Sequence, residues 1–353
     1  MAALDDRSTV ERLDPHGLLA RIEALPDQCE DAWRQALELQ LPKGYEDARE
    51  LVVLGMGGSA IAGAILLSLA LETGDKAVYV SRGYEAPAFV GRDTLVVACS
   101  HSGNTEETLS AFEQALAAGA RGFAVTTGGR LQQLAVERGA AVFAYSYDGE
   151  PRSALGCQLM TLLALAQRAG VIGEQETAVR EAIALMREER ASIGFASPLS
   201  ANRAKQLAGR LHGRLPVVVG AGPLAEAAHR WKTQINETSE SWAIWEELPE
   251  LGHNAIVGFG LPPDVVPRTH VVLLSHPELD RRLRLAYEAT EAALSAADVS
   301  HERMELSGTS PLARVLAAVF LGDLVSYYLA LLNGVAPSPV HPIDRFREHV
   351  AKG

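Results

Sequence analysis

The sequence has 353 residues, of which 48% are hydrophobic and 22% charged, and its net charge at pH 7 is −12. A chain of this length exceeds one ordinary hydrophobic core, so we expect two domains. The acidic balance argues against nucleic acid or an anionic membrane as a partner. A bound phosphate is still compatible with it, because backbone N–H groups and hydroxyls can hold a phosphate locally.

The sequence also lacks the features expected of a secreted or membrane protein. Its first twelve residues contain several charges and no apolar segment of a signal peptide. The most apolar stretch, Leu312–Leu332, is interrupted by Arg314 and Asp323, which predicts a buried helix rather than a membrane span. The three cysteines are scattered, as is typical of a reducing compartment, so we expect a cytoplasmic protein.

The first half of the chain begins with helices and continues as alternating strands and helices. Residues 8–40 carry apolar side chains at helical spacing and predict one or two N-terminal helices. The strands predicted next are Glu50–Leu54, Ala77–Ser81, Thr94–Cys99, Gly122–Val125 and Ala141–Tyr145, and the helices among them include Ala60–Leu71 and Thr105–Ala118. Such alternation predicts a parallel, doubly wound sheet.

A second series of the same kind follows. Helices are predicted at Arg152–Arg168, Glu174–Ile193, from Pro223 to about Gln234, at Leu279–Ala297 and at Ser310–Asn333, and strands at Leu215–Val219, His270–Leu274 and Val299–Leu306. A strand followed by Gly-x-Gly and a helix therefore occurs twice, at Gly55 and at Gly220. We predict an α/β fold with two doubly wound parallel-sheet domains and flanking helices. The expected boundaries are 1–165 for the N-terminal helices and first domain, 166–194 for a connecting helix, and 195–353 for the second domain.

The first motif is the glycine-rich segment Gly55–Gly63, which follows a predicted buried strand. Glycines let the backbone approach a ligand closely, and the next helix offers free N–H groups for a phosphate. A dinucleotide-binding turn is the alternative, but its third glycine position holds Ala60. Arg82 stands where that alternative requires an acidic residue for the ribose. A purely structural glycine turn is the other alternative.

The second motif is Ser100–Thr108, which joins another predicted buried strand to a helix. Ser100, Ser102 and Thr105 can each donate a hydroxyl hydrogen bond to a phosphate oxygen, and the helix dipole favours negative charge there. Ligands bind at such junctions on the carboxyl edge of parallel sheets. One such residue would be explained as a helix N-cap, but four polar residues around Gly103 are poorly explained that way.

Together the two motifs resemble the signature loops of sugar isomerase (SIS) domains, which bind phosphosugars through serines and threonines. Further segments are similar to the bifunctional phosphoglucose/phosphomannose isomerases, and the likeness covers most of the chain from about residue 45. Those segments are Arg82–Tyr84, Thr127–Leu131, Pro151–Leu155, Lys232–Glu237, Pro249–Asn254 and Pro339–Ile343. The resemblance implies that the substrate phosphate is bound by Gly57, Gly58, Ser59, Ser100, Ser102 and Thr105.

The resemblance also implies an aldose–ketose isomerase that interconverts glucose 6-phosphate and/or mannose 6-phosphate with fructose 6-phosphate through an enediol. Such chemistry needs a carboxylate base, an acid or base for ring opening, and a cation for the developing oxyanion. Glu237 matches the family's base, His253 its ring-opening residue, and Arg152 its arginine. Glu250 is our second choice for the carboxylate.

Each of these residues also has a plain structural explanation. Glu237 by itself reads as a solvated helix end, and His253 as a loop residue that bonds a backbone carbonyl. Arg152 could simply pair with the acidic stretch Asp148–Glu150.

The C-terminal segment departs from the family pattern. The family carries a lysine in its last helix, whereas this chain has arginines, and Arg347 aligns best with Arg345 as the alternative. Arginine keeps the charge but not the compact donor of lysine. This substitution supports a competing hypothesis, in which the protein is a non-catalytic phosphosugar sensor or regulator.

No cofactor and no metal are expected, since the histidines lack ligand spacing and proton transfer needs neither. The expected partners are a phosphorylated hexose and a second copy of the chain. The resemblance implies a homodimer with a shared active site. Of the proposed site residues, His253 is the one we expect the second subunit to contribute. A nicotinamide-dependent dehydrogenase is a third possibility, against which Arg82 weighs. The sequence leaves the preference between glucose and mannose phosphates open.

Overall fold

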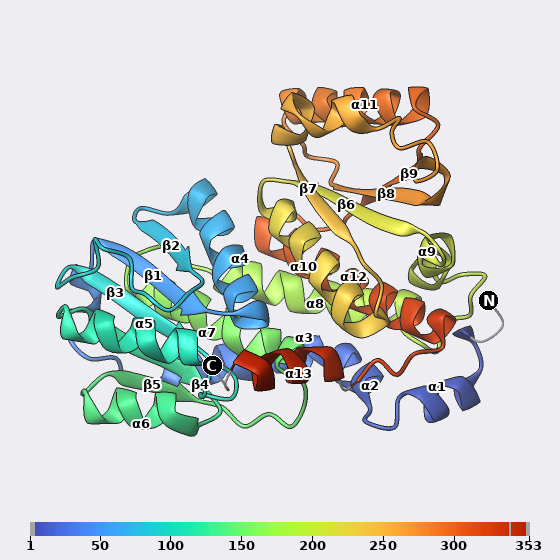
Figure 1. Cartoon of the computed structure of the whole chain (residues 1–353). Helices are drawn as coiled ribbons and strands as arrows, with labels where there is room; N and C mark the ends of the chain where they lie inside the picture. Colours follow the sequence, from blue (N-terminus) through green and yellow to red (C-terminus); the bar gives the residue numbers. More distant parts are fainter. Residues whose placement is uncertain (1–3, 339, 351–353) are drawn as a thin grey trace. The chain divides into compact units, whose positions relative to one another are not determined.

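The computed structural model describes residues 4–338 and 340–350 (Figure 1). These residues form two compact units, each with its own parallel sheet. The first-sheet unit consists of residues 24–184 and 310–313, and the second-sheet unit of residues 1–23, 185–309 and 314–353. The N-terminal segment thus belongs to the same unit as most of the C-terminal half, while the domain boundaries at 165 and 195 stay a prediction.

The first-sheet unit contains five parallel strands in the order β2-β1-β3-β4-β5. Its strands are β1 Glu50–Gly55, β2 Ala77–Ser81, β3 Thr94–Cys99, β4 Arg121–Thr126 and β5 Ala141–Ala144. Its helices are α3 Leu25–Glu38, α4 Gly57–Thr73, α5 Glu106–Ala117, α6 Gly129–Glu137 and α7 Leu155–Arg168, and α8 Glu176–Ile193 runs from this unit into the other.

Helices cover both faces of this sheet, as Figure 1 shows. On one face Val52 and Leu54 pack in a core cluster with Phe112 of α5. On the other face α4 lies so close to β1 that a Cβ atom on Gly63 would come within 2.8 Å of Val53. Alternate side chains of β1 therefore pack in two separate core layers, one on each face of the sheet, because successive side chains of a strand point to opposite faces.

The second-sheet unit contains four parallel strands in the order β7-β6-β8-β9. Its strands are β6 Leu215–Ala221, β7 Ile244–Leu248, β8 Thr269–Ser275 and β9 Ser300–Glu305. Its helices are α1 Arg7–Leu13, α2 Leu18–Glu23, α9 Arg203–Leu211, α10 Pro223–Ser239, α11 Arg281–Ala296, α12 Pro311–Asn333 and α13 His341–Val350. The first three residues of α12 belong to the first-sheet unit.

The predicted α/β class with two doubly wound parallel sheets is confirmed, and every predicted strand is present within a few residues. Two local expectations differ. Three N-terminal helices replace the one or two expected, and α4 begins at Gly57 rather than Ala60. Strand β7 was not predicted, because an edge strand reading Ile-Trp-Glu-Glu-Leu with mostly half-exposed side chains lacks the apolar run of a central strand.

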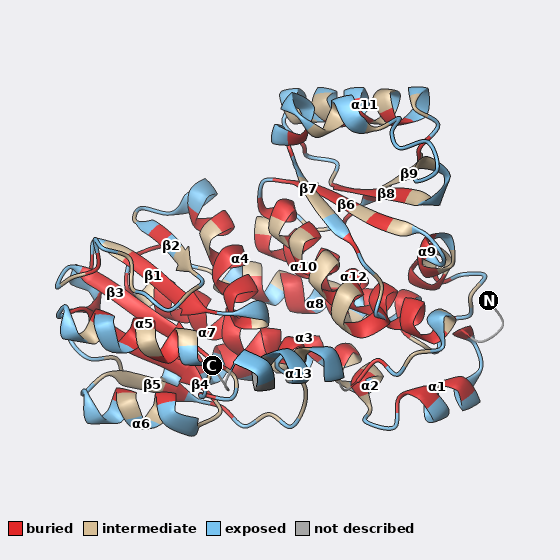
Figure 2. Ribbon diagram, viewed as in Figure 1, coloured by how far each residue is buried: buried red, intermediate tan, exposed pale blue. Residues whose placement is uncertain are grey.

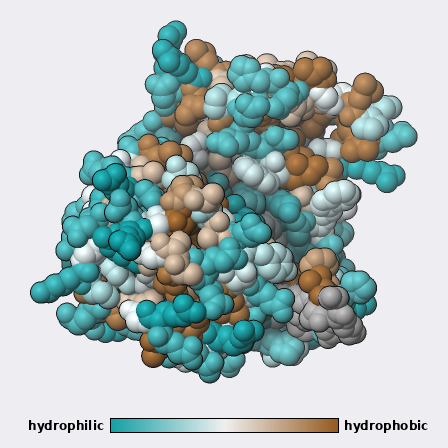
Figure 3. Space-filling model, turned by 60° about the vertical axis from the view of Figure 1, so that its left-hand side comes forward, coloured by the Kyte–Doolittle hydropathy of each residue, from teal (hydrophilic) through white to brown (hydrophobic). Residues whose placement is uncertain are grey.

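Helix α12 is the apolar stretch that the sequence analysis assigned to the interior. It is long and apolar enough to cross a membrane, but 94% of its most apolar window is buried inside the protein. Figure 2 shows it among the buried elements. On the face drawn in Figure 3, apolar side chains lie in separate patches among hydrophilic ones.

Candidate active site

The order of strands in the first sheet creates a topological switch point between β1 and β3. Connections from these two neighbouring strands leave in opposite directions, so a crevice forms outside their carboxyl ends. The two signature loops start from paired residues there, because Gly55 is the register partner of Cys99. This strand order also differs from the dinucleotide-binding order, which begins 3-2-1.

The glycine loop forms the first turn of α4 rather than a separate loop. Gly57 has a φ of +52°, which favours glycine, and among the described residues no side chain caps the helix start. The N–H groups of Gly57 and Gly58 are thus available to an anion, whereas the N–H of Ser59 donates to the Met56 carbonyl at 3.1 Å. Ser59 is buried within the turn. A Cβ atom on Gly58 would lie 3.4 Å from the Cα atom of Arg152.

The serine loop supplies a pair of hydroxyls next to that turn. Ser100 Oγ and Thr105 Oγ1 are 2.9 Å apart, and Ser100 is only 2% exposed. Thr105 occupies the N-cap position of α5 without using its side chain as a cap. Ser102 is exposed, and its hydroxyl accepts a hydrogen bond from the Asn104 backbone at 3.2 Å. The simple N-cap explanation therefore fails for Thr105.

Gly103 sets the shape of the serine loop. Its φ is +67°, and a Cβ atom there would lie 1.9 Å from the carbonyl oxygen of Gly128. Its own carbonyl accepts a hydrogen bond from the Leu131 backbone at 2.8 Å, and Asn104 Oδ1 accepts one from the Arg130 backbone at 3.2 Å. The segment Thr127–Leu131, which the sequence analysis had noted, thus holds the serine loop in place through these hydrogen bonds.

His101 is a member of the serine loop to which sequence analysis gave no role. Its Nδ1 lies 3.1 Å from the Tyr145 hydroxyl, which is itself 3.1 Å from Gln158 Nε2 of α7. Its ring also meets the edge of Tyr147, with ring centroids 6.1 Å apart. Burial lowers the pKa of His101, so the neutral imidazole is favoured. Only the aromatic residues that follow β5 could have indicated this contact.

Arg152 lies on a short 3₁₀ helix, Pro151–Ala154, that leads into α7. The residue is only 4% exposed, which is rare for an arginine unless its charge is paired. The Tyr147 hydroxyl donates to the carbonyl of Ser153 at 3.0 Å and so connects this segment to the ring of His101. The structure therefore brings Arg152 to the glycine turn, within the same unit as both signature loops.

Glu237 is half-buried on the last turn of α10 in the second-sheet unit. The turn that follows is held from two sides. Asn236 Nδ2 donates to the carbonyl of Ser241 at 2.8 Å. Asn333 Nδ2, at the end of α12, donates to the carbonyl of Ser239 and to the hydroxyl of Ser241, both at 2.8 Å. These bonds fix the helix end that carries the carboxylate.

Helix α10 is also fixed along its length against α12. Arg230 and Asp323 form a buried ion pair with an N–O distance of 2.7 Å, and Trp231 Nε1 donates to the carbonyl of Ala318 at 2.7 Å. A Cβ atom on Gly322 would lie 2.2 Å from the Trp231 ring. The two helices therefore pack at a distance that only glycine permits, and Glu237 stands on a rigid support.

His253 lies beyond the carboxyl end of β7, in the short helix Glu250–His253, and is exposed. Because α10 runs antiparallel to β7, Glu237 lies near the amino end of that strand instead. The five residues of β7 span about 16 Å. Within the second-sheet unit the structure therefore does not bring His253 to Glu237. The second-choice carboxylate, Glu250, accepts a hydrogen bond from Asn254 at 2.7 Å.

A further group of titratable side chains beside β7 was missed by the sequence analysis. His229 stacks on Trp245 with ring centroids 4.7 Å apart, and its Nδ1 lies 3.1 Å from Glu226 Oε2. Burial, with the charges of Glu226 and Glu250, raises the pKa of Glu247. An unpredicted strand carries Trp245 and Glu247, so no signal in the sequence pointed to this group.

The remaining predictions concern the C-terminus and metals. The position of Arg347 lies in α13, but its side chain is outside the described residues, as is Pro339. Arg345, the alternative, is exposed. Among the described residues, no group of three or more His, Cys, Asp or Glu side chains is placed to hold a metal ion.

Comparison with known proteins agrees with the two-domain α/β fold. A model of the SIS domain matches residues 44–165, and one described as the bacterial phospho-glucose isomerase C-terminal SIS domain matches residues 200–350. A bifunctional phosphoglucose/phosphomannose isomerase of Caldicellulosiruptor bescii is 35% identical over 93% of this chain and 97% of the relative. The chain belongs to this family.

A second member of the family, from Aquifex aeolicus, is 36% identical over 88% of this chain and 93% of the relative. A solved structure of a glucose-6-phosphate isomerase-like protein from Thermus thermophilus superposes with a TM-score of 0.63. That alignment covers 98% of both chains at 22% identity, which supports the fold alone. Membership of the bifunctional phosphoglucose/phosphomannose isomerase family thus rests on the sequence relatives.

Proposed function

We propose that the protein is an aldose–ketose isomerase that interconverts glucose 6-phosphate or mannose 6-phosphate with fructose 6-phosphate. The observation that carries this proposal is the hydroxyl pair of Ser100 and Thr105, 2.9 Å apart beside the uncapped first turn of α4. Family membership supports the identity of the sugar. Gly57, Gly58, Ser59 and Ser102 complete the proposed phosphate site.

In this proposal the reaction is a proton transfer between C2 and C1 of the open-chain sugar. Glu237 removes the proton from one carbon and returns it to the other, with an enediol between the two steps. Arg152 stabilises the negative charge that develops on the sugar oxygens. His253 transfers the proton that opens the sugar ring, and Arg347 supplies a second cation near the sugar. The reaction requires neither a metal nor a redox cofactor.

We further propose that the active site is completed by a second copy of the chain. The placement of Glu237 and His253 at opposite ends of β7 supports this, since one chain's second-sheet unit keeps them apart. Val257 and Leu261 follow His253 and are 88% and 75% exposed, an apolar surface suited to an interface. The buried free cysteines support a cytoplasmic location.

The primary test is a coupled assay of fructose 6-phosphate conversion with wild type and Glu237→Gln. Loss of the base should lower kcat by about 10²- to 10⁴-fold, while sugar phosphate binding persists. Glu240→Gln is the matched control, because Glu240 is an exposed carboxylate just beyond the same helix end. Binding without turnover in the wild type would instead indicate a phosphosugar sensor. Near-normal turnover in Glu237→Gln would remove Glu237 from the mechanism.

A mixing experiment tests the shared site. Glu237→Gln and His253→Ala should each be inactive alone, and mixing the two should restore activity, because a heterodimer contains one site with both residues intact. If the mixture stays as inactive as its parts under conditions that exchange subunits, each chain uses its own histidine.

A further inference from the structure

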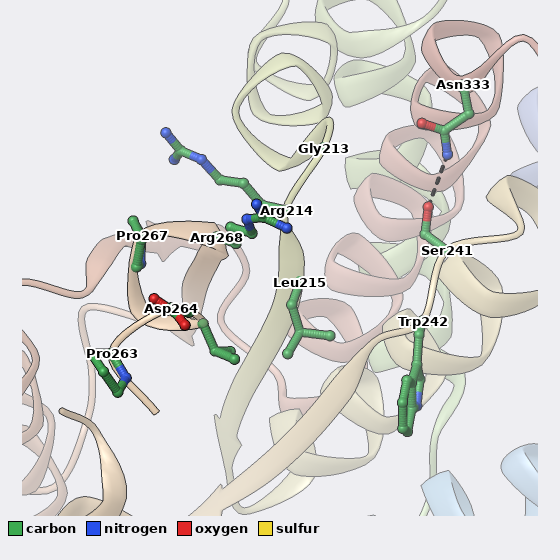
Figure 4. A pocket seen from close by; sticks show the side chains of 11 residues that line it. Gly213, Arg214, Leu215, Ser241, Trp242, Pro263, Asp264, Pro267, Arg268 and Asn333 are labelled. Atoms are coloured by element: carbon green, nitrogen blue, oxygen red, sulfur yellow. Dashed lines mark hydrogen bonds between the residues drawn. The ribbon is translucent and has the colours of Figure 1, made fainter. Parts of the chain in front are cut away.

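A cavity of about 930 Å³ opens in the second-sheet unit, at the amino edge of its sheet. Its size is within the range of small-molecule sites. Neither Glu237 nor His253 lines it. Figure 4 shows Leu215 between two contrasting walls, with Arg214 and Arg268 on one side and Trp242 on the other.

The arginine wall carries two positive charges, and one carboxylate, Asp264, lines the same cavity. Among the described residues, neither Arg214 nor Arg268 has an ion-pair partner. Other arginines of this unit are paired with acids, for example Arg210 with Glu302 at 2.6 Å. In a protein with a net charge of −12, two arginines without ion pairs at one cavity favour an anion there.

Arg214 is also held in place. Its Nη1 donates to the Ser300 hydroxyl at 3.2 Å and lies 3.4 Å from Nδ1 of the buried His270. His270 Nε2 lies 2.8 Å from Glu302 Oε1, which fixes the imidazole between β8 and β9. A guanidinium that is oriented by such contacts loses little entropy on binding an anion.

The opposite wall offers a flat apolar surface. Trp242 is 78% exposed, which is unusual for the largest apolar side chain and leaves the face of its ring open to stacking. Asp264, on the same side as the arginines in Figure 4, can accept hydrogen bonds from sugar hydroxyls. Ser241 and Asn333, which fix the end of the Glu237 helix, also line the cavity.

We propose that this cavity binds a nucleoside phosphate, with the base stacked on Trp242, the phosphate on Arg214 and Arg268, and the ribose hydroxyls toward Asp264. This inference does not rest on the proposed isomerisation. The ligand class follows from the combination of an exposed indole with two unpaired guanidinium groups across one cavity, since aromatic rings stack on bases and arginines bind phosphates.

The test is equilibrium dialysis of the full chain against radiolabelled ADP. We expect saturable binding by the wild type at millimolar ADP or below, weakened about 10-fold or more in both Trp242→Ala and Arg268→Gln. Arg281→Gln is the matched control, because it removes the same charge from an exposed helix start outside the cavity and should leave binding unchanged. All three substitutions are at exposed positions, so the fold should persist.

Three results would overturn the proposal. The first is no saturable binding by the wild type. The second is binding that Ser102→Ala abolishes and Arg268→Gln leaves intact, which would place ADP at the phosphate loops of the first-sheet unit. The third is dissociation of an oligomer by Trp242→Ala with ADP binding unaffected, which would show that a second copy of the chain covers the cavity.

Discussion

The two sheets place a Ser-His pair at equivalent points, yet their surroundings differ in chemistry. Ser100-His101 directly follows β3, and Ser275 is the last residue of β8, with His276 after it. Strand β3 pairs with β1, and β8 pairs with β6, and β1 and β6 are the first strands of their sheets along the chain. After the first pair come Ser102, a positive-φ glycine and Thr105. After the second come Pro277 and Glu278.

These following residues decide what each edge can bind. At the first sheet, hydroxyls and the free N–H groups of a helix start face the crevice, and all of them favour an anion. At the second sheet, Glu278 adds negative charge and is paired with Arg314, which also donates to the carbonyls of Gly308 and Thr309. The same architecture thus holds the proposed phosphate loop in one unit and an internal ion pair in the other.

Of the changes that distinguish the two loops, Gly103→Ala should have the largest effect on stability, because only the loop after β3 depends on a glycine. The new Cβ atom would meet the Gly128 carbonyl at 1.9 Å, and an alanine at φ +67° is strained. We expect a loss of about 2–4 kcal/mol in the unfolding free energy. Gly83→Ala is the control, since nothing lies within 4 Å of its Cβ position and its φ is not positive. Equal denaturation midpoints for both variants would show that the loop adapts.

The sequence was sufficient to predict the alternation of strands and helices, because buried strands such as β1 and β3 are continuous apolar runs. It also marked the two loops proposed to bind phosphate, whose glycines and hydroxyls lie close together in the chain. It did not predict β7, whose residues are mostly half-exposed, or the contact of His101 with Tyr145, which lie 44 positions apart. Such contacts depend on tertiary structure and leave no local pattern.

Ser100→Ala and Ser275→Ala make the same change at equivalent points of the two sheets. Both serines are 2% exposed, so their structural costs should be similar. Only Ser100 has a hydroxyl in the proposed phosphate site. Loss of one hydrogen bond to a charged group costs about 1.5–3 kcal/mol, so we expect KM for fructose 6-phosphate to rise by about 10- to 100-fold in Ser100→Ala alone. A similar rise in Ser275→Ala would contradict the assignment of the phosphate to the first sheet.

The two histidines give the smallest expected difference, seen in the pH dependence of stability. Burial lowers the pKa of His101, and burial with the charge of Arg314 lowers that of His276. The unfolded chain binds a proton at each histidine near pH 6.5, where the folded chain still does not. Each histidine therefore destabilises the fold progressively as the pH falls below about 6.5, and contributes no such loss above it.

His101→Asn and His276→Asn should each make the decline of the thermal midpoint between about pH 6.5 and pH 5 less steep, because asparagine does not titrate in this range. Asparagine at position 101 can still bond the Tyr145 hydroxyl, which is 3.1 Å from Nδ1 in the wild type, so stability near neutral pH should change little. Since the two histidines belong to different units, the two substitutions together should act additively. An unchanged acid decline in His101→Asn would mean that the imidazole is already protonated in the folded loop, where it would act as a cation for the phosphate.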